Sequence, residues 1–190
     1  MSWEALSAVS TALTAVVIAV TAIAAFREVR LTADASRAAA QQLEQLRKAT
    51  QFEGALEIFK ELDAPDQVEA RHFVQFELAE HLKDPVFLDE VSLVSGADER
   101  QHKELAVLRC FERIGFYQAK GYVEKDVLLM VASGRILTMW VALLPVVEIH
   151  RRTLGSRVWE NFEALHGQTE IYMRERGFEI DATRERFRAR

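Results

Sequence analysis

The feature that most constrains this 190-residue sequence is a long uncharged apolar run near its start. Residues 5–26 contain no Asp, Glu, Lys, Arg, Gly or Pro, and Ala, Val, Leu and Ile dominate them. A helix of this length rises about 33 Å, enough to cross a hydrocarbon core of about 30 Å. The run therefore predicts a membrane-spanning helix.

Two other structures fit such a run, and its length and flanks favour neither. A cleavable export signal usually has a basic start and an apolar segment of about 7–15 residues. Here "MSWE" contains no basic residue and the run is longer, although "AIA" at Ala22–Ala24 resembles a cleavage site. A buried core helix is the second alternative. We expect a membrane helix that is retained.

Basic residues follow the run, and none precedes it. Arg27 and Arg30 lie directly after it, and Trp3 lies before it. Positive residues stay on the cytoplasmic side of a membrane, and Trp favours the interface. We therefore expect a single-pass protein of the cell's inner (cytoplasmic) membrane, with its N-terminus outside and its C-terminal domain in the cytoplasm.

The hydroxyl residues of the run lie within an arc of about 100° on one side of the helix. They are Ser7, Ser10, Thr11, Thr14 and Thr21. Hydroxyl and small residues let membrane helices pack closely, so this stripe is a candidate self-association face. The alternative is that each hydroxyl bonds the carbonyl four residues earlier and faces only lipid.

The rest of the chain predicts an all-α protein, because Gly (8) and Pro (3) are scarce and no strand-like alternation occurs. The expected parts are an outer tail (1–4), a transmembrane helix (5–26), a helical stalk (27–51), a compact bundle of about five helices (52–176) and an Arg-rich tail (177–190). A second apolar run, Val127–Val147, contains Arg135 and Pro145. An arginine in mid-membrane is costly, so we expect the central helix of the bundle there, kinked or divided at Pro145.

Motifs that carry chemistry are missing from the sequence. There is no phosphate loop, dinucleotide-binding glycine pattern, nucleophile elbow or HExxH pair, so we expect no enzyme, no cofactor and no metal. The net charge of −5 argues against a nucleic-acid partner. The only cysteine, Cys110, has apolar neighbours and is expected to be an inert buried thiol.

Glu112 is the polar residue of greatest interest. It shares a helical face with Leu105 and Leu108, so its carboxylate is expected to point inward. A buried charge needs a partner, and we predict that Glu112 pairs with Arg135 or Arg71. A structural ion pair is the favoured interpretation, and a ligand-binding or catalytic carboxylate is the alternative.

The sequence resembles a family of uncharacterised bacterial proteins classified as a domain of unknown function. The likeness is carried by "FREVR" after the apolar run, "FERIGFYQAKGYVEKD" at Phe111–Asp126, Trp140 with "PVVEIHRR", and "VWENFEALHG". The resemblance implies an N-terminal membrane helix with a compact helical domain and supplies no activity. Glu112 corresponds to the Glu of the family's "FERIG" stretch.

We therefore expect an interaction or scaffold module at the inner face of the membrane. Its expected partners are membrane lipid and a protein, which is either an unidentified one or a second copy of this chain. The alternative is a membrane-linked sensor or defence component that binds a small ligand in the helical domain. A cavity that holds Glu112 and Arg135 would favour the sensor, and a filled core would favour the module. The tail "ATRERFRAR" is expected to be solvated or to touch anionic lipid.

Overall fold

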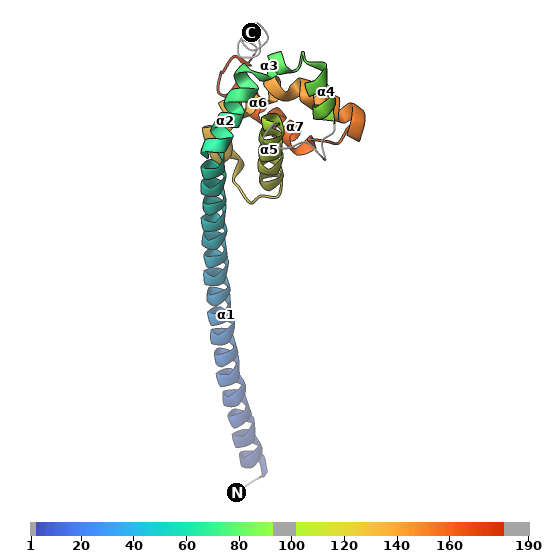
Figure 1. Ribbon diagram of the computed structural model, residues 1–190. Coiled ribbons are helices and arrows are strands. Elements are labelled where there is room, and N and C mark those ends of the chain that lie inside the picture. Colours follow the sequence, from blue (N-terminus) through green and yellow to red (C-terminus); the bar gives the residue numbers. More distant parts are fainter. Residues whose placement is uncertain (1–2, 93–101, 181–190) are drawn as a thin grey trace. The chain divides into compact units, whose positions relative to one another are not determined.

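The computed structural model describes residues 3–92 and 102–180, and all regular structure within these ranges is helical (Figure 1). The all-α prediction is confirmed. The helices are α1 (Trp3–Leu62), α2 (Pro65–Phe76), α3 (Leu78–His81), α4 (Pro85–Ser92), α5 (Lys103–Ala119), α6 (Lys125–Leu154) and α7 (Glu160–Glu175). By contact the chain divides between Ala49 and Thr50 into two compact units, and α1 contributes to both.

The first unit is the part of α1 up to Ala49. Every described side chain from Ser10 to Ala49 is exposed, and the most apolar window has a mean hydropathy of 1.9. This helix is long and apolar enough to cross a membrane. Its hydroxyls are bonded locally, since Thr11, Thr14 and Thr21 donate to backbone carbonyls four residues earlier at 2.8–3.0 Å. Packing of the hydroxyl stripe against a second helix stays a prediction.

The second unit begins with the last turns of α1. Ala55, Ile58 and Leu62 form the buried face here, whereas Phe52 is 62% exposed. Helical spacing alone would place Phe52 on the same apolar face as Ala55 and Leu62, but its side chain stays exposed. The Gln51 side chain donates to the carbonyl of Gly121 at 3.1 Å, which ties this end of α1 to the loop after α5.

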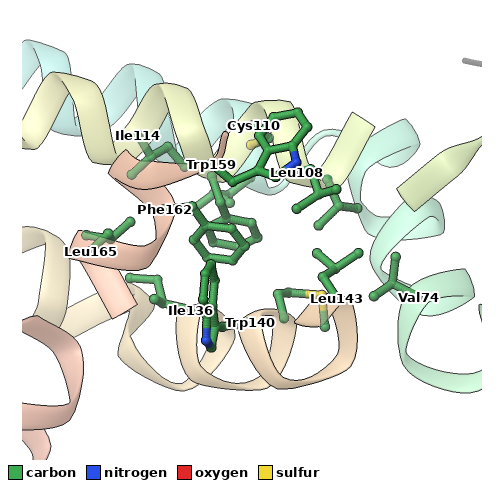
Figure 2. Packing of buried hydrophobic residues seen from close by; sticks show 14 of the residues in the cluster. Val74, Leu108, Cys110, Ile114, Ile136, Trp140, Leu143, Trp159, Phe162 and Leu165 are labelled. Atoms are coloured by element: carbon green, nitrogen blue, oxygen red, sulfur yellow. The ribbon is translucent and has the colours of Figure 1, made fainter. Parts of the chain in front are cut away.

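The core of the second unit lies among α5, α6 and α7. α5 packs against α7 and α2, and α6 packs against α7 (Figure 1). At the centre the ring of Phe162 stacks on Phe111 at 4.9 Å and meets the edge of Trp140 at 5.0 Å. Figure 2 shows Trp140 rising from α6 toward Phe162 of α7. Offset and edge-to-face rings stabilise a core beyond the area they bury.

Helix α6 is the apolar run that the sequence offered as a second span. Leu128, Leu129, Ile136 and Leu143 are fully buried within the domain. The helix continues through Pro145 without division. Proline removes one backbone hydrogen bond, but residues on both sides of it are packed into the core, so the helix is held on each side of that gap.

Candidate functional site

The carboxylate of Glu112 binds the start of α7. One oxygen accepts hydrogen bonds from the backbone N–H and the side-chain amide of Asn161, at 3.3 and 2.6 Å. The other accepts the backbone N–H of Phe162 at 2.8 Å. The first N–H groups of a helix have no partner within it, and a negative charge there is stabilised by the helix dipole. Glu112 therefore caps α7 from a different helix.

A glycine one turn further along α5 makes this contact possible. A Cβ atom on Gly115 would lie 2.3 Å from the carbonyl oxygen of Asn161, which is closer than any side chain tolerates. Glycine at this position lets the start of α7 approach the backbone of α5. Glu112 and Gly115 thus act together. Glu112 caps α7, and Gly115 leaves the space that lets α7 come close enough to be capped.

The predicted pairing of Glu112 with Arg135 or Arg71 is wrong. Arg135 pairs with Asp63 at 2.9 Å, near the end of α1, and is 40% exposed. Glu112 is half-buried, and its partners are the N–H groups of α7. Periodicity placed Glu112 on the correct side of its helix, but the helix dipole and free amides of α7 satisfy the carboxylate in place of an arginine.

Arg71 lies in a charged cluster with Arg135 and Asp63. Burial lowers the pKa of Arg71, and the charge of Arg135 lowers it further. Within the described chain its Nη1 atom has no hydrogen-bond partner. Cys110 lies nearby and is buried, and burial together with Glu61 raises the pKa of its thiol to about 12. The expected burial of this thiol is confirmed, and a thiol with a pKa this high is almost never ionised at neutral pH.

An open hollow of about 430 Å³ borders the Glu112 cap. Its lining combines basic and aromatic side chains: Arg109, Arg113, Phe116, Tyr117 and Trp159, with Glu112 and Asn161. A second, mostly apolar hollow of about 250 Å³ lies between the end of α1 and Tyr117 and Tyr122. Arg135 lines neither hollow. Neither is therefore the cavity with both Glu112 and Arg135 that would have favoured a ligand sensor.

Two buried histidines are held by specific partners that the sequence did not reveal. Nε2 of His150 donates to the carbonyl of Val91 at 2.9 Å, and Nδ1 accepts the indole N–H of Trp159 at 2.9 Å. Because indole can only donate, His150 is the neutral Nε2–H tautomer, and burial lowers its pKa. Nδ1 of His102 lies 2.8 Å from Glu104, and burial raises the pKa of that carboxyl.

Trp159 has an unusual backbone. Its φ of 64° is in the left-handed region, which side chains other than Gly, Asn and Asp rarely adopt. The indole is 8% exposed and bonded to His150, so burial and this hydrogen bond hold the strained turn before α7. The same turn presents Asn161 and Phe162 to Glu112.

A comparison with known families finds a match over most of the chain. The sequence profile of the family described as Domain of unknown function (DUF4760) matches residues 10–169. The chain belongs to the DUF4760 family. The match begins in the apolar part of α1 and ends in α7, so it includes parts of both units and the Glu112 cap. No curated protein and no solved structure matches the chain.

Sequence reasoning identified Glu112 but missed most of its surroundings. Gly115, three residues after Glu112, was the one local signal of a close helix contact. The His150–Trp159 contact joins residues on either side of a turn whose geometry no pattern announced. Most of the Arg-rich tail lies outside the described residues, apart from 177–180.

Proposed function

We propose that this DUF4760 protein is a single-pass, membrane-anchored helical interaction module. The apolar start of α1 crosses the membrane, the stalk follows, and the domain from Thr50 presents docking surfaces at the inner face. Anchoring holds such a domain near the bilayer and raises its effective concentration for partners there.

One observation carries this proposal. The most apolar window of α1 has a mean hydropathy of 1.9 and none of its residues is buried. Exposed side chains such as Leu13, Val16 and Ile23 would lie in water if the helix were soluble, at a cost of about 25 cal/mol per Å² of apolar surface. Lipid removes that cost.

The charged flank supports the orientation. Arg27 and Arg30 follow the apolar window, and the guanidinium of Arg30 lies 4.7 Å from the ring of Phe26. Basic residues favour the cytoplasmic leaflet, where anionic lipid attracts them by about 1 kcal/mol each. The proposal therefore places Trp3 at the outer interface and both arginines at the inner one.

The packing of the domain supports an interaction role rather than a ligand sensor. Leu105, Leu143 and Phe162 are fully buried, and the two hollows described above open on the surface. Both oxygens of Glu112 accept hydrogen bonds from the start of α7, so the carboxylate has a structural role that requires no ligand. The acidic net charge of −5 argues against a nucleic-acid partner.

Charge in the middle of the span tests the anchor. The span is worth roughly 3–5 kcal/mol on an insertion scale, and each central arginine costs about 2.5–3.5 kcal/mol. We expect wild-type protein to stay in the pellet after carbonate extraction of membranes. The double variant Val16→Arg with Val17→Arg should move to the supernatant.

The matched control adds the same charges to the stalk, as Gln41→Arg with Gln45→Arg. That variant should stay in the pellet. If the wild-type chain is found in the supernatant as readily as the span variant, α1 is not an anchor. Labelling of a cysteine placed at Ser2, from outside intact cells, would test the orientation.

A further inference from the structure

Helix α1 keeps one unbroken helical phase from the apolar window through the stalk, because no residue interrupts it between Trp3 and Leu62. One side of it can therefore be followed by spacings that alternate between four and three residues, as in a heptad repeat. We call this side the pairing face. It contains Thr11, Ala15, Ile18, Ala22, Ala25, Val29, Thr32, Ser36, Ala39, Leu43 and Leu46.

In the stalk the pairing face carries no charge at all. The opposite side, at the outward b and f positions of the same heptads, carries most of the charged residues of the stalk. They are Arg27, Arg30, Asp34, Arg37, Glu44 and Lys48. On the pairing face Val29, Leu43 and Leu46 are 66%, 67% and 64% exposed. Charge toward water and apolar residues on the other side is the pattern of a helix that packs against a partner.

In the apolar window the chemistry reverses but the geometry stays the same. The outward positions carry bulky residues, namely Leu13, Val16, Val20 and Ile23, whereas the pairing face is small except at Ile18. Membrane helices meet through small residues and turn large ones to lipid. The hydroxyl residues Thr14 and Thr21 border the same face, and their hydroxyls are already bonded to their own helix.

Outward residues are mostly charged in the stalk and bulky and apolar in the apolar window. In both regions, however, the same side of the helix is suited to a partner. We propose that two copies of this chain pair in parallel along the pairing face, from the apolar window to Leu46. The pairing rests on the anchor proposed above, since insertion in one orientation aligns the stalks of two copies at equal depth. A left-handed supercoil keeps a face of this period in contact along its length.

A second copy fits this face because the face complements itself. In a parallel pair each level meets its own copy, so small residues meet small ones and Leu43 and Leu46 meet leucines. Only Glu28 and Arg47 among the charged stalk residues border the face, and neither is opposed by a like charge, because flanking positions five residues apart face each other across the pair. Gln42 is the neighbour that this spacing gives to Arg47.

Disulfide scanning of the full-length protein in native membranes tests the pairing. Cys110, the only native cysteine, is 1% exposed with a pKa of about 12, so wild-type chain provides a silent background. A disulfide needs Cα atoms within about 7 Å. Under mild oxidation Leu43→Cys should give a band of twice the chain's mass, several-fold stronger than Gln45→Cys, which lies off the face on the same turn.

A second matched pair lies closer to the membrane. Val29→Cys is on the pairing face and Leu31→Cys is beside it, and both native residues are apolar and exposed. The crosslink at Val29→Cys should disappear when Leu43→Glu and Leu46→Glu are added. It should persist with Gln41→Glu and Gln45→Glu, which add the same charge to the other side.

Each result decides between explanations. Equal crosslinking at positions 43 and 45, or none at either, would overturn the pairing. A crosslinked band of another mass in place of the double-mass band would mean that a different protein occupies the face, and would overturn the pairing. Carbonate extraction of the same membranes scores the anchor separately, so an anchored chain that does not crosslink refutes the pairing alone.

Discussion

Two helices of this chain are almost equally apolar and have opposite surroundings. The most apolar window of α1 has a mean hydropathy of 1.9 with 0% buried, whereas the window of α6 reaches 2.0 with 44% buried. Hydropathy measures how strongly a segment leaves water, and it does not say which apolar medium receives it. For α6 that medium is the core of its own domain. For α1 the described residues supply none, and we propose lipid.

The two helices already differ in whether a charged residue interrupts their apolar run. Arg135 lies within the apolar part of α6 and reaches Asp63 at the surface of the domain, where both side chains contact solvent. Residues 5–26 contain no such residue. A single charge needs water or a partner near water. Its presence therefore distinguishes a core helix from a membrane span better than mean hydropathy does.

Truncating a core ring should show this contrast most strongly. Phe162→Ala removes the ring that contacts both Phe111 and Trp140, and we expect a loss of about 3–5 kcal/mol in the free energy of unfolding. Val20→Ala, a truncation on the outward side of α1, should change it by no more than about 0.5 kcal/mol. Urea unfolding in detergent micelles, followed by the fluorescence of buried tryptophan, measures both. Equal losses would mean that the core is not where we place it.

Adding one methyl group tests how closely the helices of the domain approach. Gly115→Ala forces a Cβ against the backbone of Asn161 and should cost about 1–3 kcal/mol. Gly134→Ala, on α6 with open space around it, should instead stabilise by up to about 1 kcal/mol through helix propensity. Thermal unfolding of the two variants checks the opposite signs. A stabilising Gly115→Ala would remove the close contact from the account of the Glu112 cap.

Truncating a glutamate should also lower the free energy of unfolding more in the second unit than in the first. Glu112→Ala leaves backbone amides at the start of α7 without their acceptor, and we expect a loss of about 1–3 kcal/mol. Glu44→Ala breaks only an exposed pair with Lys48 at 3.8 Å in α1, which is worth at most about 0.5 kcal/mol. The same denaturation assay compares them. A ligand-binding role for Glu112 would gain support if its removal left stability unchanged.

The smallest expected effect is a dependence on pH that belongs to the domain alone. Burial lowers the folded-state pKa of His150 below its ordinary 6.5, so the unfolded chain binds this proton more tightly. Its contribution to stability is therefore complete above pH 6.5. It is lost as the pH falls from there toward the folded-state pKa, by at most about 1.4 kcal/mol per pH unit. His150→Gln should reduce this slope in unfolding experiments between pH 7 and 5, and an unchanged slope would refute the assignment.

Particular residues show how far sequence reasoning reached. The all-α class and the long apolar helix follow from composition and periodicity, because helix formers and spacing act locally. The family was indicated by a resemblance of particular motifs, among them "FERIGFYQAKGYVEKD". Glu112 was identified as a residue that needs a partner, yet the predicted partner was wrong. That error arose because arginines are visible in a sequence, whereas the free amides at the start of another helix are not.

Similar reasons explain the other differences. Phe52 fits an apolar helical period but is exposed, and Ile58 is buried in its region of α1, because the neighbouring elements decide which side of a helix is covered. Pro145 predicted a kink or a break, and the break does not occur, because packing on both sides holds α6 continuous. Local preference was outweighed in each case by contacts between distant segments.

The sequence by itself determined that the chain is helical, that its N-terminal helix is apolar and uncharged, and that charge lies on one side of the stalk. These are properties of residues a few positions apart, which share one helix and need no other part of the chain. Only the tertiary structure decided that α6 is covered by protein, that Glu112 caps α7, and that His150 binds Trp159. Each of those depends on where a second element places its backbone, and that position results from packing of the whole core.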